Sequence, residues 1–255
     1  MTRRRGLAAG AVVLSFVVAG CSDVAASETN PSLTPSSTPT APTPTVSTPA
    51  AKPTVVKPKP RVKQKPAYYA LRVERQLDKL GYPVGDVDGD ITVRAKQALC
   101  AWRETHGLPV NRNGLNLNDA YSVLNATTRP AATRSPGIYV NKTCQILYQV
   151  VGKTYKRIVW ISTGAPGYDT PNRTGKVWRK WAGAHESSLY DDAFMYDSIY
   201  FLKDRPGIAL HGSGVNTLIK PYPASHRCVR VLRPEIHQIY ADTPLGTKVQ
   251  IYGEF

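Results

Sequence analysis

Apolar residues first recur at helical spacing in the stretch between positions 71 and 124. One helix is predicted over Leu71–Leu80, with Gly81 ending it, a second over Ala95–Trp102, and a third, shorter one over Leu117–Leu124. Each segment is too short to bury a core alone, so the three are expected to pack together. The pattern predicts a small module of three helices over residues 68–126.

From residue 135 onward the pattern changes to short runs of β-branched and aromatic residues, which favour strands. Strands are predicted at Gly137–Asn141, Gln145–Val151, Lys156–Ser162, Ser198–Phe201, Gly207–Leu210 and Thr247–Tyr252, with a hairpin turn at Gly152. Pro234 is placed to begin one short helix. The expected fold class is therefore α+β and multidomain, with the helical module followed by a mostly-β sandwich or barrel-like domain over residues 135–255.

The first 66 residues show neither pattern. Arg3–Arg5 precede an apolar stretch that is too short to span a bilayer and ends in small residues before Cys21. This layout predicts a signal peptide over residues 1–20, and it resembles a bacterial lipobox, which implies that Cys21 is the first mature residue and carries lipid. Residues 21–66, rich in Pro, Thr, Ser and Lys, are predicted to form an unfolded, semi-stiff tether.

The chain of 255 residues carries a formal net charge of +15. Such a charge favours an anionic partner: nucleic acid, an anionic membrane or an acidic cell wall. The basic residues are scattered along the sequence and form no dense run, which argues against nucleic acid. The signal peptide then favours the outer face of the cytoplasmic membrane and the cell wall.

Candidate chemistry is concentrated in two segments near the carboxyl end. His211-Gly212-Ser213 follows an apolar run, and Ser225-His226-Arg227-Cys228-Val229-Arg230 comes a loop's length later. A cysteine acts as a nucleophile when a base or a positive field makes its thiolate accessible. Two histidines and two arginines close to Cys228 supply both requirements.

These two segments resemble the signature of the YkuD-type L,D-transpeptidase family, as do Ser162-Thr163-Gly164 and Thr170-Pro171 upstream. The resemblance implies that Cys228 forms an acyl-enzyme with a peptidoglycan stem peptide and passes it to an amine of a neighbouring strand. It assigns His211 as the general base and acid, oriented by a carbonyl of Gly212 or Ser213, and it implies no cofactor and no metal. The sequence departs from the family at Arg227, where glycine is usual and where a positive φ is easier for glycine.

The remaining roles are assigned from the chemistry of the residues near Cys228. Backbone N–H groups near Arg227 and Cys228 would stabilise the developing oxyanion, with Ser225 and His226 shaping this region. Arg230 is a candidate to bind a substrate carboxylate through its planar guanidinium, with a structural salt bridge as the alternative. Tyr196 is a candidate to line the donor cleft, with core packing as the alternative.

The helical module resembles the peptidoglycan-binding type 1 domain at Leu80-Gly81-Tyr82, Asp88-Gly89 and Trp102-Arg103, among others. It departs at Thr92 and Ala95, and a helical spacer packed on the next domain is the alternative. The acidic run at Asp86–Asp90 lacks the glycine and the bidentate glutamate of an EF-hand, so it predicts a turn.

Four cysteines are present, and their roles follow from the assignments above. With Cys21 lipidated and Cys228 catalytic, Cys100 and Cys144 remain in an exported chain, where disulfides persist. We predict that these two pair and join the two domains; two independent buried thiols are the alternative.

Two other functions compete with an L,D-transpeptidase. One is a zinc-dependent wall peptidase with ligands from His211, His226, Cys228, His185 and Glu186, although the spacing is irregular. The other is a non-catalytic wall-binding lipoprotein in which Arg227 marks an inactive site. The expected partners are stem peptides and, through lipid, the membrane, and the expected state is a monomer.

Overall fold

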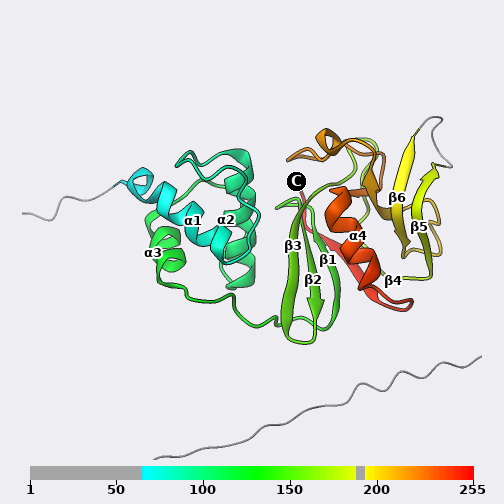
Figure 1. Cartoon of the computed structure of the whole chain (residues 1–255), viewed down its shortest axis with the longest axis horizontal. Helices are drawn as coiled ribbons and strands as arrows, with labels where there is room; N and C mark the ends of the chain where they lie inside the picture. Colours follow the sequence, from blue (N-terminus) through cyan, green and yellow to red (C-terminus); the bar gives the residue numbers. More distant parts are fainter. Residues whose placement is uncertain (1–64, 188–192) are drawn as a thin grey trace, which may run out of the picture. The chain divides into compact units, whose positions relative to one another are not determined.

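The computed structural model, shown in Figure 1, describes residues 65–187 and 193–255. The predicted signal peptide, the lipidated Cys21 and nearly all of the tether lie outside the described residues. Within those two ranges, none of the helices is both long and apolar enough to span a bilayer.

The helices of the described residues are η1 (Pro66–Tyr69), α1 (Ala70–Lys79), α2 (Val93–Thr105), α3 (Leu117–Asn125), η2 (Asn216–Leu218) and α4 (Arg233–Ala241). Thr92 is the N-cap of α2, and its hydroxyl accepts a hydrogen bond from the Ala95 amide at 3.2 Å. Asn116 begins α3 with a reciprocal capping box to Asp119. The acidic run ending at Asp90 forms a bend, closed by hydrogen bonds within the run and to Glu74.

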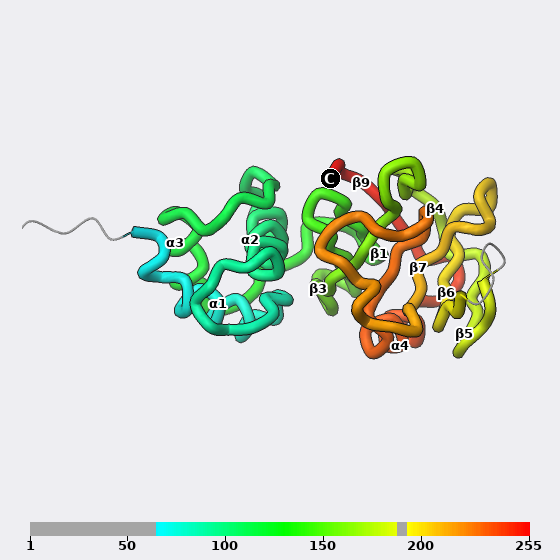
Figure 2. The backbone as a smooth tube through the Cα atoms, turned by 90° about the horizontal axis from the view of Figure 1, so that it is seen from above, coloured from blue at the N-terminus to red at the C-terminus, as the bar shows by residue number. Residues whose placement is uncertain are grey.

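The strands of the described residues are β1 (Gly137–Asn141), β2 (Ile146–Val151), β3 (Thr154–Ser162), β4 (Thr174–Lys176), β5 (Arg179–Glu186), β6 (Phe194–Tyr200), β7 (Ala209–Ser213), β8 (Val229–Val231) and β9 (Lys248–Tyr252). They form one mixed sheet in the order β4-β9-β1-β2-β3-β8-β7-β6-β5. The β1–β2–β3 antiparallel meander and β9, which returns parallel to β1 beside it in Figure 2, form one half of the sheet.

The sheet is curled, so that its two edge strands, which are neighbours in sequence, come together. Only Val177 and Trp178 separate β4 from β5, yet these strands lie at opposite ends of the strand order. The Val177 amide bonds to the Thr247 carbonyl before β9, and the Trp178 amide bonds to the Tyr200 carbonyl at the end of β6. The predicted sandwich or barrel is therefore a single sheet bent far enough to bring its edges together.

Some predicted strand positions are wrong. Gln145 precedes β2 and lies in a left-handed turn with φ 52°. The strand predicted at Gly207–Leu210 is β7, which begins two residues later than predicted. The stretch after residue 162 contains β4 and is followed by β5, and neither strand was among those predicted. Most residues of β5 are exposed, so its sequence has no apolar alternation to reveal a strand.

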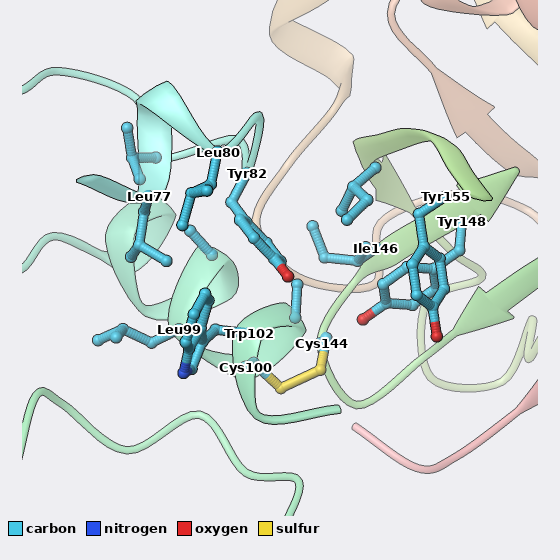
Figure 3. Packing of buried hydrophobic residues seen from close by; sticks show 14 of the residues in the cluster. Leu77, Leu80, Tyr82, Leu99, Cys100, Trp102, Cys144, Ile146, Tyr148 and Tyr155 are labelled. Carbon is cyan, nitrogen blue, oxygen red and sulfur yellow. A yellow bond between two sulfur atoms is a disulfide. The ribbon is translucent and has the colours of Figure 1, made fainter. Parts of the chain in front are cut away.

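Both faces of the first three strands are buried. Alternate residues such as Ile138, Leu147 and Ile161 pack toward α4, whose Ile236 and Ile239 complete that core. Residues on the opposite face pack against the helices (Figure 3). One core contains the sheet residues Tyr139, Ile146, Tyr148, Tyr155 and Ile158 and the residues Leu77, Tyr82, Leu99 and Trp102 of the helical region. The helical region therefore packs on one face of the β1–β2–β3 meander.

A disulfide crosses this same interface. Cys100 on α2 is bonded to Cys144, which lies in the turn between β1 and β2, with a Cα–Cα distance of 5.5 Å (Figure 3). Nearby, Glu104 of α2 forms an ion pair with Arg134 at 2.7 Å and accepts from the side-chain Nδ2 of Asn141 at 2.6 Å. Covalent and polar contacts thus reinforce the apolar interface.

Candidate active site

The pairing of β7 with β8 places the candidate nucleophile and base on one face of the sheet. The strands are parallel, with Leu210 opposite Val229 and His211 opposite Arg230. Because side chains alternate along a strand, His211, Arg230 and Cys228 share a face, and Leu210 and Val229 point into the core behind it. Cys228 itself lies one residue before β8 and packs on Ala209 and Met195.

These residues line a cleft of about 440 Å³. Its wall consists of residues from β6, β7, the segment after β7 and the segment before β8: Met195, Tyr196, Tyr200, Gly207, His211, Ser213, Gly214, Val215, Leu218, Ser225, His226, Cys228 and Arg230, among others. The sulfur is therefore not sealed from solvent, although Cys228 is only 8% exposed. The volume suits an extended peptide segment.

Burial controls the protonation of Cys228. Desolvation raises the pKa of its thiol, an effect that a backbone hydrogen bond near Ala209 and the positive charge of Arg230 reduce only in part. The thiol donates to the Gly207 carbonyl at 3.5 Å. The resting sulfur at neutral pH is therefore a thiol and not a thiolate.

His211 is held as a neutral imidazole in one tautomer. Burial lowers its pKa to about 4, and the charges of Arg230 and His185 act in the same direction. Its Nδ1 lies 2.9 Å from the Gly212 carbonyl, which can only accept, so Nδ1 carries the proton and Nε2 is left as a base. Gly212 also allows α4 to approach, since a Cβ there would lie 2.8 Å from Ile236.

The segment before Cys228 is anchored to the end of β3. The Thr163 carbonyl accepts from the Ala224 and Ser225 amides at 2.8 and 2.9 Å. Ser225 then donates through its hydroxyl to the Cys228 carbonyl. The Thr170 hydroxyl accepts from the Gly164 amide and donates to the Arg227 carbonyl at 2.9 Å. The turn that precedes the nucleophile is thereby held from the 163–170 segment.

Arg227 adopts the left-handed conformation that the family's glycine would provide. Its φ is 79°, and its side chain is exposed. A Cβ in this region costs about 1–2 kcal/mol. Glycine would adopt this φ without strain, whereas Arg227 adopts it at a cost in backbone energy.

Replacing Arg227 with glycine should increase the free energy of unfolding by roughly 0.5–1 kcal/mol. The strain energy that is removed exceeds the stability lost to the greater conformational entropy of glycine in the unfolded chain, which is about 0.4–1 kcal/mol. Urea denaturation of the variant measures the difference. Arg205→Gly is the matched control, because Arg205 is also exposed but does not have a positive φ; it should be destabilising. Equal losses for both variants would contradict the strain at position 227.

The other predicted site residues lie around the cleft. His226 is exposed at its rim, with its ring edge-on to Tyr168 at 4.5 Å. Arg230 is half-buried and donates to the Ala224 carbonyl at 3.0 Å. Tyr196 lines the cleft and packs under the guanidinium of Arg233 at 3.9 Å. Ser213 is buried in the wall.

The residues considered as zinc ligands do not converge. His185 lies on β5, where its Nε2 is 2.8 Å from the Ser198 hydroxyl. In the part of the chain that the structure describes, no three His, Cys, Asp or Glu side chains are grouped closely enough to hold a metal ion.

Several residues of the site were not predicted individually. Gly207, Met195 and Tyr200 surround the sulfur, and only their proximity in the sheet reveals this. Thr163 and Thr170 belong to stretches whose resemblance to the family was visible, but no role was attached to them. Gln145, which holds Thr163 through two hydrogen bonds, carries no sequence signal.

Residues 135–251 match the family model of the YkuD L,D-transpeptidase catalytic domain. The match covers 117 of the 255 residues, so the carboxy-terminal part of the chain carries a domain of this family. A comparison with curated proteins finds no match.

Among solved structures, the chain is similar to an L,D-transpeptidase from Xylanimonas cellulosilytica, with 29% identity, a TM-score of 0.50 and coverage of 77% of this chain and 100% of the other. An L,D-transpeptidase from Stackebrandtia nassauensis is 23% identical, with a TM-score of 0.46 and coverage of 75% and 94%. A match over 77% of 255 residues is longer than the segment 135–255. The similarity to the Xylanimonas structure therefore includes part of the helical region.

Proposed function

We propose that this protein is a cysteine-dependent L,D-transpeptidase that cross-links peptidoglycan stem peptides through an acyl-enzyme. The observation that carries the proposal is the placement of Cys228 and His211 on one face of the sheet, in the wall of one cleft. His211 has the tautomer that a base needs, because its Nδ1 proton is engaged by Gly212.

In the first step Cys228 Sγ attacks the carbonyl carbon that precedes a terminal D-amino acid. His211 Nε2 takes the thiol proton during the attack, which gives a tetrahedral oxyanion. The C–N bond then breaks, His211 returns the proton to the leaving amine, and the D-amino acid departs from a thioester on Cys228.

In the second step an amine of a neighbouring strand attacks the thioester carbon. His211 accepts a proton from this amine, the C–S bond breaks, and the proton returns to the sulfur. The new amide is the cross-link, and the enzyme regains its neutral thiol and imidazole. Since burial disfavours both charged forms, proton transfer and nucleophilic attack occur together at this site.

The segment from Ser225 to Cys228 supplies the remaining contacts in this proposal. Amides near Arg227 and Cys228 are candidates to bind the oxyanion, because the carbonyls of both residues are already bonded to Thr170 and Ser225 and hold the turn in place. Arg230 and Tyr196 face the cleft and are assigned to the donor peptide, Arg230 toward a carboxylate. His226 shapes the rim.

We further propose a setting in the cell. In this proposal the protein is exported and acts on the cell wall, and lipid on Cys21 holds it at the outer face of the cytoplasmic membrane. The helical region is proposed to bind peptidoglycan, and the protein to act as a monomer.

Mass spectrometry of products tests the proposal most directly. Purified wall fragments incubated with the full chain should yield dimers that have lost one terminal D-amino acid, and a thiol-reactive carbapenem should add covalently to the peptide containing Cys228. Cys228→Ala should form neither product nor adduct. Activity that persists in Cys228→Ala and stops with a chelator would indicate a metal peptidase, and no activity in either protein would indicate a wall-binding lipoprotein.

A further inference from the structure

One face of α2 contacts the catalytic domain through three side chains spaced three residues apart. Arg94, Gln97 and Cys100 follow one another along this face. Cys100 carries the disulfide to Cys144, and the other two residues make hydrogen bonds to backbone carbonyls that lie outside the helices. These carbonyls belong to segments that lead to the active site.

Gln97 connects α2 to the amino-terminal side of the nucleophile segment. Its buried amide nitrogen donates to the carbonyls of Cys144 and Gln145, at 3.1 Å each. Gln145 sits in the left-handed turn before β2, and its side chain bonds both the amide and the hydroxyl of Thr163, at 2.9 and 2.8 Å. Thr163 in turn accepts from the Ser225 amide. A continuous chain of buried hydrogen bonds therefore runs from α2 to the turn that carries Cys228.

Arg94 connects the same helix to the segment between β7 and β8. One guanidinium nitrogen donates to the carbonyl of Ile219, at the end of η2, and another donates to the Gln97 side chain at 3.0 Å. The guanidinium lies over the Trp160 ring at 4.4 Å, which fixes its direction. Leu218, next to Ile219, lines the cleft. Arg94 thus anchors the part of this segment that forms the cleft wall.

We infer that Arg94 and Gln97 are positioning residues for acyl transfer: from the helical region, they hold the 214–228 segment in the geometry that places Cys228 in the same cleft wall as His211. This inference rests on the proposed function and gives the helices a role in catalysis that does not depend on binding the wall. The two residues bond to each other, so the two anchors act as one unit. A small shift of this segment would change the distance and angle at which the sulfur approaches the substrate carbonyl. Such a misplacement lowers the rate of the reaction.

The test measures acylation of the full chain by a carbapenem, with the maximal rate and the half-saturating concentration determined separately. Arg94→Met keeps the stem that packs on Trp160 but removes both donors, and it should lower the maximal rate roughly tenfold, the size expected for a lost charged hydrogen bond at a buried carbonyl. Arg94→Lys retains one charged donor and should recover most of the rate. Gln97→Met should resemble Arg94→Met.

Arg112→Met is the matched control. Arg112 also joins the helical region to the end of the chain, because its guanidinium lies over the ring of Phe255 at 3.5 Å and not over a residue of the 214–228 segment. All variants are compared at a temperature at which thermal unfolding shows them fully folded. An unchanged maximal rate in Arg94→Met, or an equal loss in Arg112→Met, would overturn the inference. Failure of the unmodified chain to acylate at Cys228 would instead overturn the proposed function.

Discussion

Replacing His211 with alanine should lower the rate of acylation of Cys228 by about 10²- to 10⁴-fold, the usual contribution of a positioned general base. The effect is expected to be large because burial raises the pKa of the Cys228 thiol, so that little thiolate exists without a proton acceptor. The measurement is the rate of carbapenem adduct formation at pH 7, followed by intact-protein mass spectrometry.

The control for this variant is His237→Ala, which removes an exposed imidazole on α4 that lies outside the cleft and contacts Asp197 at 3.0 Å. It should leave the rate within a factor of about two, as expected for a surface substitution. The pH profile of the unmodified chain is the second check. His211 accepts a proton only while neutral, so activity should be retained as pH falls below 6.5 and lost through pH 4, near its lowered pKa. An acid limb near pH 6.5 would contradict a buried base.

Removing the disulfide between the helices and the sheet should lower the free energy of unfolding by about 4 kcal/mol. Cys100 and Cys144 are separated by 44 positions, and closing a loop of this length in the unfolded chain accounts for that amount. The double substitution Cys100→Ala and Cys144→Ala avoids new buried polar groups at two positions that are fully buried. Chemical denaturation of the variant and the unmodified chain measures the difference.

Peptide mapping of the exported protein without reductant provides the direct check, and it should recover one linked peptide pair containing both residues. Two free thiols at these positions would contradict the bond. Cys228→Ala is the matched control for the stability measurement, since it removes the free cysteine among the described residues and leaves the disulfide in place.

The candidate base and nucleophile could be predicted from sequence, because the two short segments that contain them have a recognisable order of residues. His211 and Cys228 needed no structure to be singled out, and the meander before them could be predicted from its β-branched and aromatic runs. The helical segments were equally visible, since their apolar residues recur at local spacing. Local signals of this kind depend only on neighbours within about ten residues.

The tertiary structure alone decided how these residues meet. Cys228 and His211 share a face because β7 and β8 pair in parallel with a register that no local pattern encodes. Gln145 and Arg94 gave no signal, because the carbonyls and side chains that they hold lie 18 and 125 positions away. The sequence by itself therefore singled out the proposed reacting groups and predicted most of the elements. The sheet pairing and the buried hydrogen bonds, which join residues distant in the chain, determined where those groups lie and how they titrate.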